Sequence, residues 1–139
     1  MNILFLCVGN SARSQIAEGL AKEMYPPDFN IKSAGSMPSG FVHEDAIKTM
    51  AEIDIDISNQ KSKSIEDLED EFIENLDYII TLCAEEICPA MLNDAKKINW
   101  LNPDPVIAEI SSFQQEAIFR KTRKNIFTLL KKFFTNLDL

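Results

Sequence analysis

Apolar residues in this sequence form short runs that alternate with stretches of helical spacing. The strand-like runs cover residues 2–8, 30–36, 78–83 and 97–101. Apolar residues recur every three or four positions over residues 16–24, 43–53 and 111–137, which predicts amphipathic helices. Strands that alternate with helices indicate an α/β fold with a parallel sheet.

The residues between these stretches predict where elements begin and end. Ser64, with Asp67 three positions later, predicts the N-cap of a helix that runs to about residue 74. Right-handed crossovers and a functional loop after the first strand favour strand order 2-1-3-4. We therefore predict a single domain over residues 1–139, a flavodoxin-like three-layer sandwich with a four-stranded parallel sheet and helices on both faces.

Composition narrows the class of protein. The formal net charge is −8, most acidic residues lie in segment 44–86, and the pI is near 4.6, which argues against nucleic acid as a partner. No apolar run reaches the length of about 18 residues that a membrane span needs. The opening residues, MNILFLCV, lack the basic segment and cleavage site of a signal peptide. We therefore expect a cytoplasmic protein with no membrane partner.

Three cysteines, Cys7, Cys83 and Cys88, are an odd number for a disulfide framework. They favour catalysis, metal binding or simple burial. A zinc site needs about four ligands, and His43 is the only histidine. We therefore expect no bound metal.

The segment from Cys7 to Arg13 joins the first strand to the first helix. A loop of this length at a helix N-terminus directs backbone N–H groups toward one point, where the helix dipole adds positive charge. Gly9 would permit the positive φ that such a loop needs, and Arg13 would bind two oxygens of a tetrahedral anion. We predict an oxyanion cradle formed by residues Val8, Gly9, Asn10, Ser11, Ala12 and Arg13.

The same positive field would stabilise a Cys7 thiolate and make it a nucleophile. Ser14, or Ser11 in part, could donate a hydrogen bond to this sulfur when it acts as a leaving group. A cysteine at the end of a buried strand is also compatible with an inert core residue. Asp104, between two prolines after the last strand, is a candidate general acid, although Asp-Pro alone is only a turn signal.

The motifs CVGNSARS at 7–14 and NPDP at 102–105 resemble those of the low-molecular-weight protein tyrosine phosphatases. SARSQIAEGL at 11–20, with TLCAEEICP at 81–89, is similar to the redox branch of that superfamily, the thioredoxin-coupled arsenate reductases. The similarity spans nearly the whole chain and includes SAGS at 33–36 and IDIS at 55–58.

This resemblance implies a cysteine relay. Cys7 would attack arsenate, with loss of water assisted by Asp104. Cys83 would then release arsenite and form a disulfide with Cys7, and Cys88 would pass that disulfide to a Cys83–Cys88 pair that thioredoxin reduces. Residues five apart in an α-helix are separated by a rise of about 7.5 Å, whereas a disulfide allows Cα separations of about 4.4–6.8 Å. We hypothesise that segment 83–92 is ordered when reduced and unwinds on oxidation.

The resemblance also implies which small molecules bind. Arsenate is the expected substrate, with phosphate or sulfate as mimics; thioredoxin is the expected electron donor, and no cofactor is tightly bound. Some members of the branch bind a monovalent cation at positions that match Asn10, Glu18 and Ser33. Lys63 stands here in place of a further Asp, and its ammonium group could replace the ion.

Two other functions remain open. A phosphatase that hydrolyses phosphomonoesters through a phosphocysteine at Cys7 would share the anion cradle, and weak phosphatase activity is expected in any case. Such an enzyme would be expected to carry aromatic residues on the pocket rim, but Val106 follows the Asp-Pro pair and the tyrosines lie elsewhere. A redox-regulated binding protein without turnover is the second alternative, and the combination of Cys7, Arg13 and Asp104 argues against it.

Overall fold

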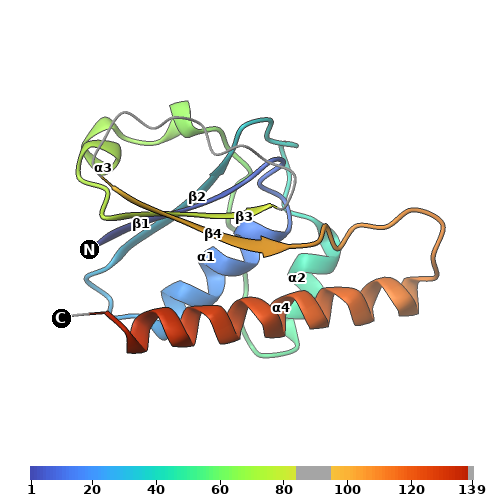
Figure 1. The fold of residues 1–139 in the computed structure, drawn as a ribbon. Helices are drawn as coiled ribbons and strands as arrows, with labels where there is room; N and C mark the ends of the chain where they lie inside the picture. The colour runs from blue at the N-terminus through green and yellow to red at the C-terminus, as the bar shows by residue number, and fades with distance from the viewer. Residues whose placement is uncertain (84–94, 138–139) are drawn as a thin grey trace.

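A computed structural model describes residues 1–83 and 95–137 of the chain. A four-stranded parallel sheet runs through its centre in the order β2-β1-β3-β4 (Figure 1). The strands are β1 (Asn2–Cys7), β2 (Asn30–Gly35), β3 (Tyr78–Cys83) and β4 (Lys96–Asn102). The predicted flavodoxin-like order 2-1-3-4 is confirmed.

Three helices cover one face of the sheet and a shorter segment covers the other (Figure 1). The first group consists of α1 (Arg13–Met24), α2 (Glu44–Ala51) and α4 (Ser112–Thr135). The opposite face carries a 3₁₀ turn, η1 (Ile65–Asp67), and the short helix α3 (Asp70–Glu74). The result is the predicted three-layer arrangement.

Strand β1 contributes side chains to two hydrophobic cores, one on each face of the sheet. Ile3 and Phe5 face α1 and α4, whereas Leu4 and Leu6 face the segment around α3, and all four are almost completely buried. Side chains alternate between the two faces of a strand, so the continuous apolar run is what a central strand with two covered faces requires. This strand ends at Cys7, at the carboxyl edge of the sheet.

The segment predicted as one helix over residues 64–74 is instead divided in two. Ser64 does begin the first turn, where its backbone N–H and hydroxyl both donate to the Asp67 carboxylate, at 3.0 and 3.2 Å. The chain then becomes extended at Leu68, with ψ 149°, before α3 begins. This break allows Leu68 and Phe72 to enter the same core, so tertiary packing overrides the continuous helical pattern.

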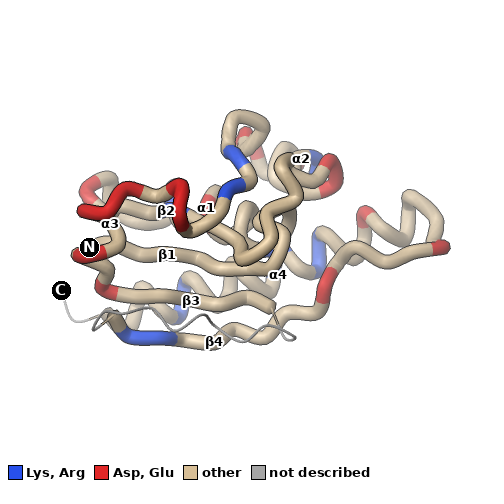
Figure 2. The backbone as a smooth tube through the Cα atoms, turned by 90° about the horizontal axis from the view of Figure 1, so that it is seen from above, with Lys and Arg blue, Asp and Glu red and all other residues tan. Residues whose placement is uncertain are grey.

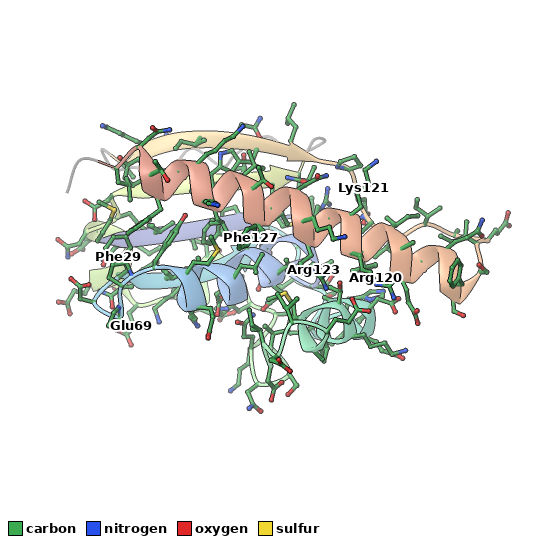
Figure 3. All side chains as sticks on the ribbon, turned by 90° about the horizontal axis from the view of Figure 1, so that it is seen from below. Phe29, Glu69, Arg120, Lys121, Arg123 and Phe127 are labelled. Carbon is green, nitrogen blue, oxygen red and sulfur yellow. The ribbon has the colours of Figure 1, made fainter. Side chains whose placement is uncertain are left out.

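Helices α2 and α4 are joined by charged side chains. Arg120 and Arg123 project from α4 toward α2 (Figure 3), and each places a nitrogen 2.9 Å from a carboxylate oxygen of Glu52. Arg123 is itself buried and also donates to Thr49. The described helices include none that is long and apolar enough to cross a membrane.

Candidate active site

A cavity of about 470 Å³ opens at the carboxyl edge of the sheet, where β1 passes into α1. Its walls come from the loop between these elements and from two segments distant in sequence. The lining residues are Cys7, Val8, Gly9, Ser11, Ala12, Arg13, Phe41, His43, Asp104 and Val106. Five of the six predicted cradle residues therefore face this space, together with the predicted nucleophile and acid.

The loop after Cys7 orients its peptide groups by its outward hydrogen bonds. Backbone carbonyls of the loop accept from the backbone N–H groups of the segment that follows β2. The pairs are Met37 to Val8, Ser39 to Gly9 and His43 to Ser11, at 2.8–2.9 Å. No described peptide bond is cis, and in a trans peptide the N–H is opposite the carbonyl. The N–H groups of the residues that follow these carbonyls therefore point back across the loop, as in an anion-binding nest.

Asn10, the sixth predicted cradle residue, is fully buried and supports the loop from behind. Its amide nitrogen donates to Ser14 Oγ at 2.8 Å and to Ser33 Oγ at 3.0 Å. Its amide oxygen accepts from Gln15 Nε2 at 3.0 Å and from the Lys63 backbone N–H at 2.9 Å. The Asn10 side chain therefore supports the loop and does not line the cavity, and the contribution of its backbone N–H to the cradle stays a prediction.

The positive φ of the loop also belongs to Asn10, at 46°, and Gly9 has none. The prediction for Gly9 was therefore wrong. Asparagine tolerates the left-handed region better than most residues, and here four side-chain hydrogen bonds hold it there. The glycine that the loop does require is Gly35 at the end of β2, since a Cβ there would lie 2.9 Å from the Cys7 carbonyl oxygen.

Ser14 lies in the first turn of α1 and is fully buried. Its oxygen accepts a hydrogen from Asn10, whose amide nitrogen can only donate. The hydroxyl hydrogen of Ser14 is therefore directed away from Asn10, which suits the predicted role of donor to a thiolate.

Cys7 and Cys83 bring their sulfur atoms 2.7 Å apart, because β1 and β3 are neighbours and both end at the same edge of the sheet. Both cysteines are buried and neither is in a disulfide. The Cys83 thiol donates to Cys7 and accepts from the Val8 backbone N–H at 3.1 Å. The hydrogen bond to Cys7, burial and the negative charge of Cys7 all raise the pKa of Cys83, while Arg13 and the Val8 amide oppose this shift. These effects together favour the protonated form of Cys83.

Arg13 connects the loop to the last strand. Its side chain is buried, and Nη1 donates to the backbone carbonyl of Asn102 at 2.8 Å. Asn102 ends β4 and immediately precedes the loop that carries Asp104. The guanidinium therefore reaches the cavity from a fixed position, because a buried hydrogen bond restricts its rotamers.

Asp104 lies on an exposed loop at the edge of the cavity. Its Oδ1 accepts from the backbone N–H of Val106 at 3.0 Å, which fixes the carboxylate relative to the loop. The other predicted redox residue, Cys88, lies outside the described residues. The same holds for the segment 83–92 that was expected to unwind, except for Cys83.

Phe41 corrects the prediction that the cavity rim lacks aromatic residues. It lines the cavity with its side chain 59% exposed. His43, also in the lining, caps α2 by accepting from the Asp45 N–H at 3.0 Å and stacks on Phe119. Both were missed because they follow a Gly/Ser/Pro segment whose path the sequence does not define.

The residues predicted around a monovalent cation form a continuous network. The Ser33 hydroxyl donates to Glu18 Oε1 at 2.6 Å while accepting from Asn10. Glu18 is buried, and Lys63 Nζ lies 3.6 Å from its Oε1, with Lys22 Nζ 2.7 Å from Oε2. Burial lowers the pKa of Lys63, and the Glu18 carboxylate opposes that shift. Two ammonium groups, those of Lys22 and Lys63, therefore lie beside the Glu18 carboxylate, and the replacement of a cation by Lys63 stays a prediction.

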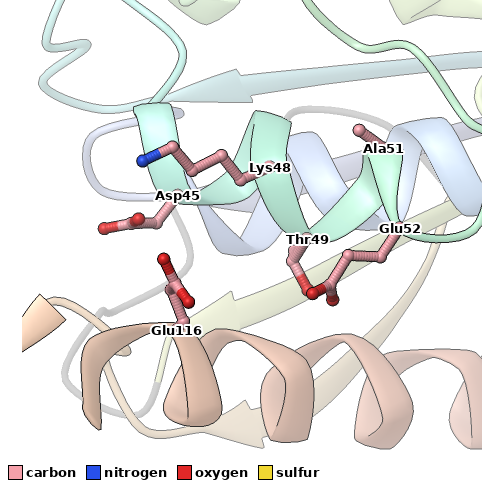
Figure 4. A pocket seen from close by; sticks show the side chains of 6 residues that line it. All are labelled: Asp45, Lys48, Thr49, Ala51, Glu52 and Glu116. Atoms are coloured by element: carbon pink, nitrogen blue, oxygen red, sulfur yellow. The ribbon is translucent and has the colours of Figure 1, made fainter. Parts of the chain in front are cut away.

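Charged residues of the described part of the chain gather at two places away from this cavity. Acidic residues gather around α3, at the end of the sheet opposite the cavity (Figure 2). A second cavity of about 440 Å³ lies between α2 and α4, and its lining is mainly charged (Figure 4). Across residues 1–83 and 95–137, no group of three or more His, Cys, Asp or Glu side chains is arranged to hold a metal ion.

Comparison with known proteins identifies the family to which this fold and this loop belong. The family described as low molecular weight phosphotyrosine protein phosphatase matches residues 2–139. The chain is a member of that family.

Its relatives include reductases. An arsenate reductase of Halalkalibacterium halodurans is 39% identical over 133 residues, covering 94% of this chain and 93% of the relative. A solved arsenate reductase in the phosphate binding state is 30% identical, with a TM-score of 0.78 and coverage of 99% of this chain and 100% of the other. A thioredoxin-dependent arsenate reductase of Corynebacterium glutamicum is 28% identical, with a TM-score of 0.68, and this chain covers 62% of it. The predicted resemblance to arsenate reductases is confirmed.

Proposed function

We propose that this protein reduces arsenate to arsenite, with Cys7 as the nucleophile and Cys83 as the second thiol. The observation that carries the proposal is the contact between the Cys7 and Cys83 sulfurs at 2.7 Å beside an anion cradle. Hydrolysis of a phosphate ester needs one cysteine, whereas reduction of arsenic needs two electrons, which a pair of thiols supplies on forming a disulfide. The arsenate reductases among its relatives support this choice.

In the first step, the Cys7 thiolate attacks arsenic(V) and one oxygen leaves as water. The N–H groups of the loop and Arg13 stabilise the charge on the remaining oxygens. Asp104 donates the proton that converts the leaving oxygen to water. The product is a covalent Cys7–arsenic adduct in which arsenic is still pentavalent.

In the second step, Cys83 attacks the Cys7 sulfur and the electron pair of the sulfur–arsenic bond passes to arsenic. A Cys7–Cys83 disulfide forms, and arsenic leaves as trivalent arsenite. The hydrogen bond to Cys7, burial and the negative charge of Cys7 raise the pKa of Cys83 in the free protein. That charge leaves the Cys7 sulfur once it bonds to arsenic, while Arg13 and the Val8 amide continue to favour the Cys83 thiolate. Cys83 is therefore activated only after the adduct has formed.

Recycling completes the proposed cycle. Cys88 would attack Cys83 and release Cys7, and thioredoxin would reduce the resulting Cys83–Cys88 disulfide. The thioredoxin-dependent arsenate reductase to which the chain is similar supports this donor. Such a cycle needs a compartment in which thiols stay reduced, which favours the cytoplasm.

We further propose that Lys63 replaces a monovalent cation beside Glu18.

A second activity is favoured by Phe41. Its exposed ring on the cavity rim could stack on the leaving group of an aryl phosphate, and the anion cradle suits phosphate as well as arsenate. We therefore expect slow hydrolysis of aryl phosphates through a phosphocysteine at Cys7. Phe41→Ala should reduce this hydrolysis about fivefold, given a stacking contribution of about 1 kcal/mol, with arsenate reduction within twofold of wild type.

The test of the proposed function is arsenite release by wild type and by Cys7→Ser, Cys83→Ser and Cys88→Ser, with thioredoxin recycling. Wild type should turn over many times, and each variant should lose multiple turnover. Cys88→Ser should still release about one equivalent of arsenite, because Cys7 and Cys83 supply the first two electrons. Full turnover by Cys83→Ser and Cys88→Ser would refute the relay.

A further inference from the structure

One side chain of α4 is hydrogen-bonded on both sides of the loop that carries Asp104. Gln115 Nε2 donates to the backbone carbonyl of Pro105, and its Oε1 accepts from the backbone N–H of Ile107 at 3.1 Å. The amide therefore pairs with the groups that flank Val106, as a neighbouring strand would. Gln115 is half-buried, whereas residues 103–109 are mostly exposed.

These two bonds reach the candidate acid through Val106. The residue between them, Val106, donates its N–H to Asp104 Oδ1 at 3.0 Å and lines the cavity with Asp104. On its other side the loop begins at Asn102, whose carbonyl is held by Arg13. The loop is thus fixed at its start by the anion-binding arginine and beyond Asp104 by Gln115.

Helix capping does not explain the position of Gln115. The first turn of α4 is already capped by Ser111 and Gln114, since Gln114 N–H donates to Ser111 Oγ at 3.1 Å and Ser111 N–H donates to Gln114 Oε1 at 3.0 Å. Both the nitrogen and the oxygen of the Gln115 side-chain amide bond to the loop instead. It also does not line the cavity, so direct contact with the anion is not its role.

We propose that Gln115 is a positioning residue that holds the Asp104 loop in the register needed for proton transfer to the leaving oxygen. This inference rests on the proposed role of Asp104. Proton transfer depends on a heavy-atom separation of about 2.6–3.2 Å, so a loop released from Gln115 places the acid correctly for only part of the time. Binding of the anion to the cradle does not depend on that loop.

Loss of the Gln115 side chain should therefore slow the reaction without weakening the binding of arsenate. Misplacement of about 1 Å can cost about a hundredfold in rate, and partial release of an otherwise proline-restricted loop should cost about tenfold. The rate of single-turnover arsenite release, measured without reductant, reports this step directly. The arsenate concentration that gives half the maximal rate should stay within twofold of wild type.

Gln115→Ala and Gln114→Ala form a matched pair on adjacent positions. Gln114→Ala removes the two hydrogen bonds that Gln114 Oε1 accepts from the N–H and the hydroxyl of Ser111. It touches neither Pro105 nor Ile107, so its rate should stay within twofold of wild type. Gln115→Ala should be about tenfold slower. A Gln115→Ala rate within twofold of wild type, or an equal loss in Gln114→Ala, would overturn the inference.

Two further variants separate positioning from a general loss of structure. Gln115→Glu cannot donate to Pro105 when ionised but regains a donor when protonated, so its rate relative to wild type should recover as the pH falls below about 5. A relative rate that stays low at all pH values would contradict the inference.

In an Asp104→Ala background, Gln115→Ala should cause no further loss, and a full additional tenfold loss would mean that Gln115 acts elsewhere. If Asp104→Ala itself leaves the rate unchanged, the proposed role of Asp104 fails, and the inference falls with it.

Discussion

Substitution of Asn10 tests whether the scaffold behind the anion loop is as important as the geometry indicates. Asn10→Ala removes four side-chain hydrogen bonds, to Ser14, Ser33, Gln15 and the Lys63 backbone. Each is worth about 1 kcal/mol net, although bonds in one network are not additive. Placing alanine at φ 46° adds about 1 kcal/mol. We expect a total loss of about 3–5 kcal/mol in the free energy of unfolding.

Asn10→Gly separates the two contributions. Glycine loses the same side-chain bonds but adopts the left-handed conformation without strain, so it should be about 1 kcal/mol more stable than Asn10→Ala. Urea unfolding followed by the fluorescence of Trp100 gives both values, and phosphate binding measured by calorimetry should weaken in both variants. The reasoning would be refuted if Asn10→Ala unfolded within about 1 kcal/mol of wild type, or if Asn10→Gly were the less stable variant.

Three more predictions concern backbone approach, thiol ionisation and surface charge. Gly35→Ala should fold poorly or unfold at least 2 kcal/mol more easily by urea titration, because its Cβ would collide with the Cys7 carbonyl; wild-type stability would contradict this. Cys7→Ser should shift the ultraviolet thiolate titration of Cys83 to lower pH, because the hydrogen bond to the Cys7 sulfur and the negative charge of that sulfur, which both raise the pKa of Cys83, are removed; an unchanged titration would count against these causes. The Arg120 hydrogen bond lowers the pKa of Glu52, so this pair stabilises the protein above the usual glutamate pKa of about 4.3 and loses its effect as the pH falls through the lowered value. Arg120→Ala should therefore cost at most about 0.5 kcal/mol at pH 7 and nothing at pH 2 in thermal unfolding, and an equal cost at both values would be inconsistent with the linkage.

The sequence was sufficient to predict the central strands of the sheet, because a strand that is buried on both faces has a continuous run of apolar residues. β1 and β3 are recognisable as continuous apolar runs, and β3 has the predicted bounds. Once the order 2-1-3-4 is fixed, the carboxyl ends of these two strands are neighbours, which is why Cys7 and Cys83 meet. The anion loop was recognisable because its chemistry depends on residues close together in sequence.

The errors arose where long-range contacts decide the conformation. Asn10, not Gly9, adopts the positive φ because hydrogen bonds to the first turn of α1 and to two distant segments, at Ser33 and Lys63, hold its side chain. Phe41 lies on the cavity rim because the backbone after β2 is bonded to the anion loop. The split between η1 and α3 follows from burial of Leu68. Local propensity carries no information about any of these.

The central claim is that Cys7 is a thiolate in the free protein at neutral pH. The rate of Cys7 alkylation by iodoacetamide, measured against pH with mass spectrometry to identify the modified cysteine, tests it most directly. The midpoint should lie well below the usual cysteine value of about 8.5, and added phosphate should slow the reaction by occupying the cradle. A midpoint near 8.5, with no protection by phosphate, would contradict the claim.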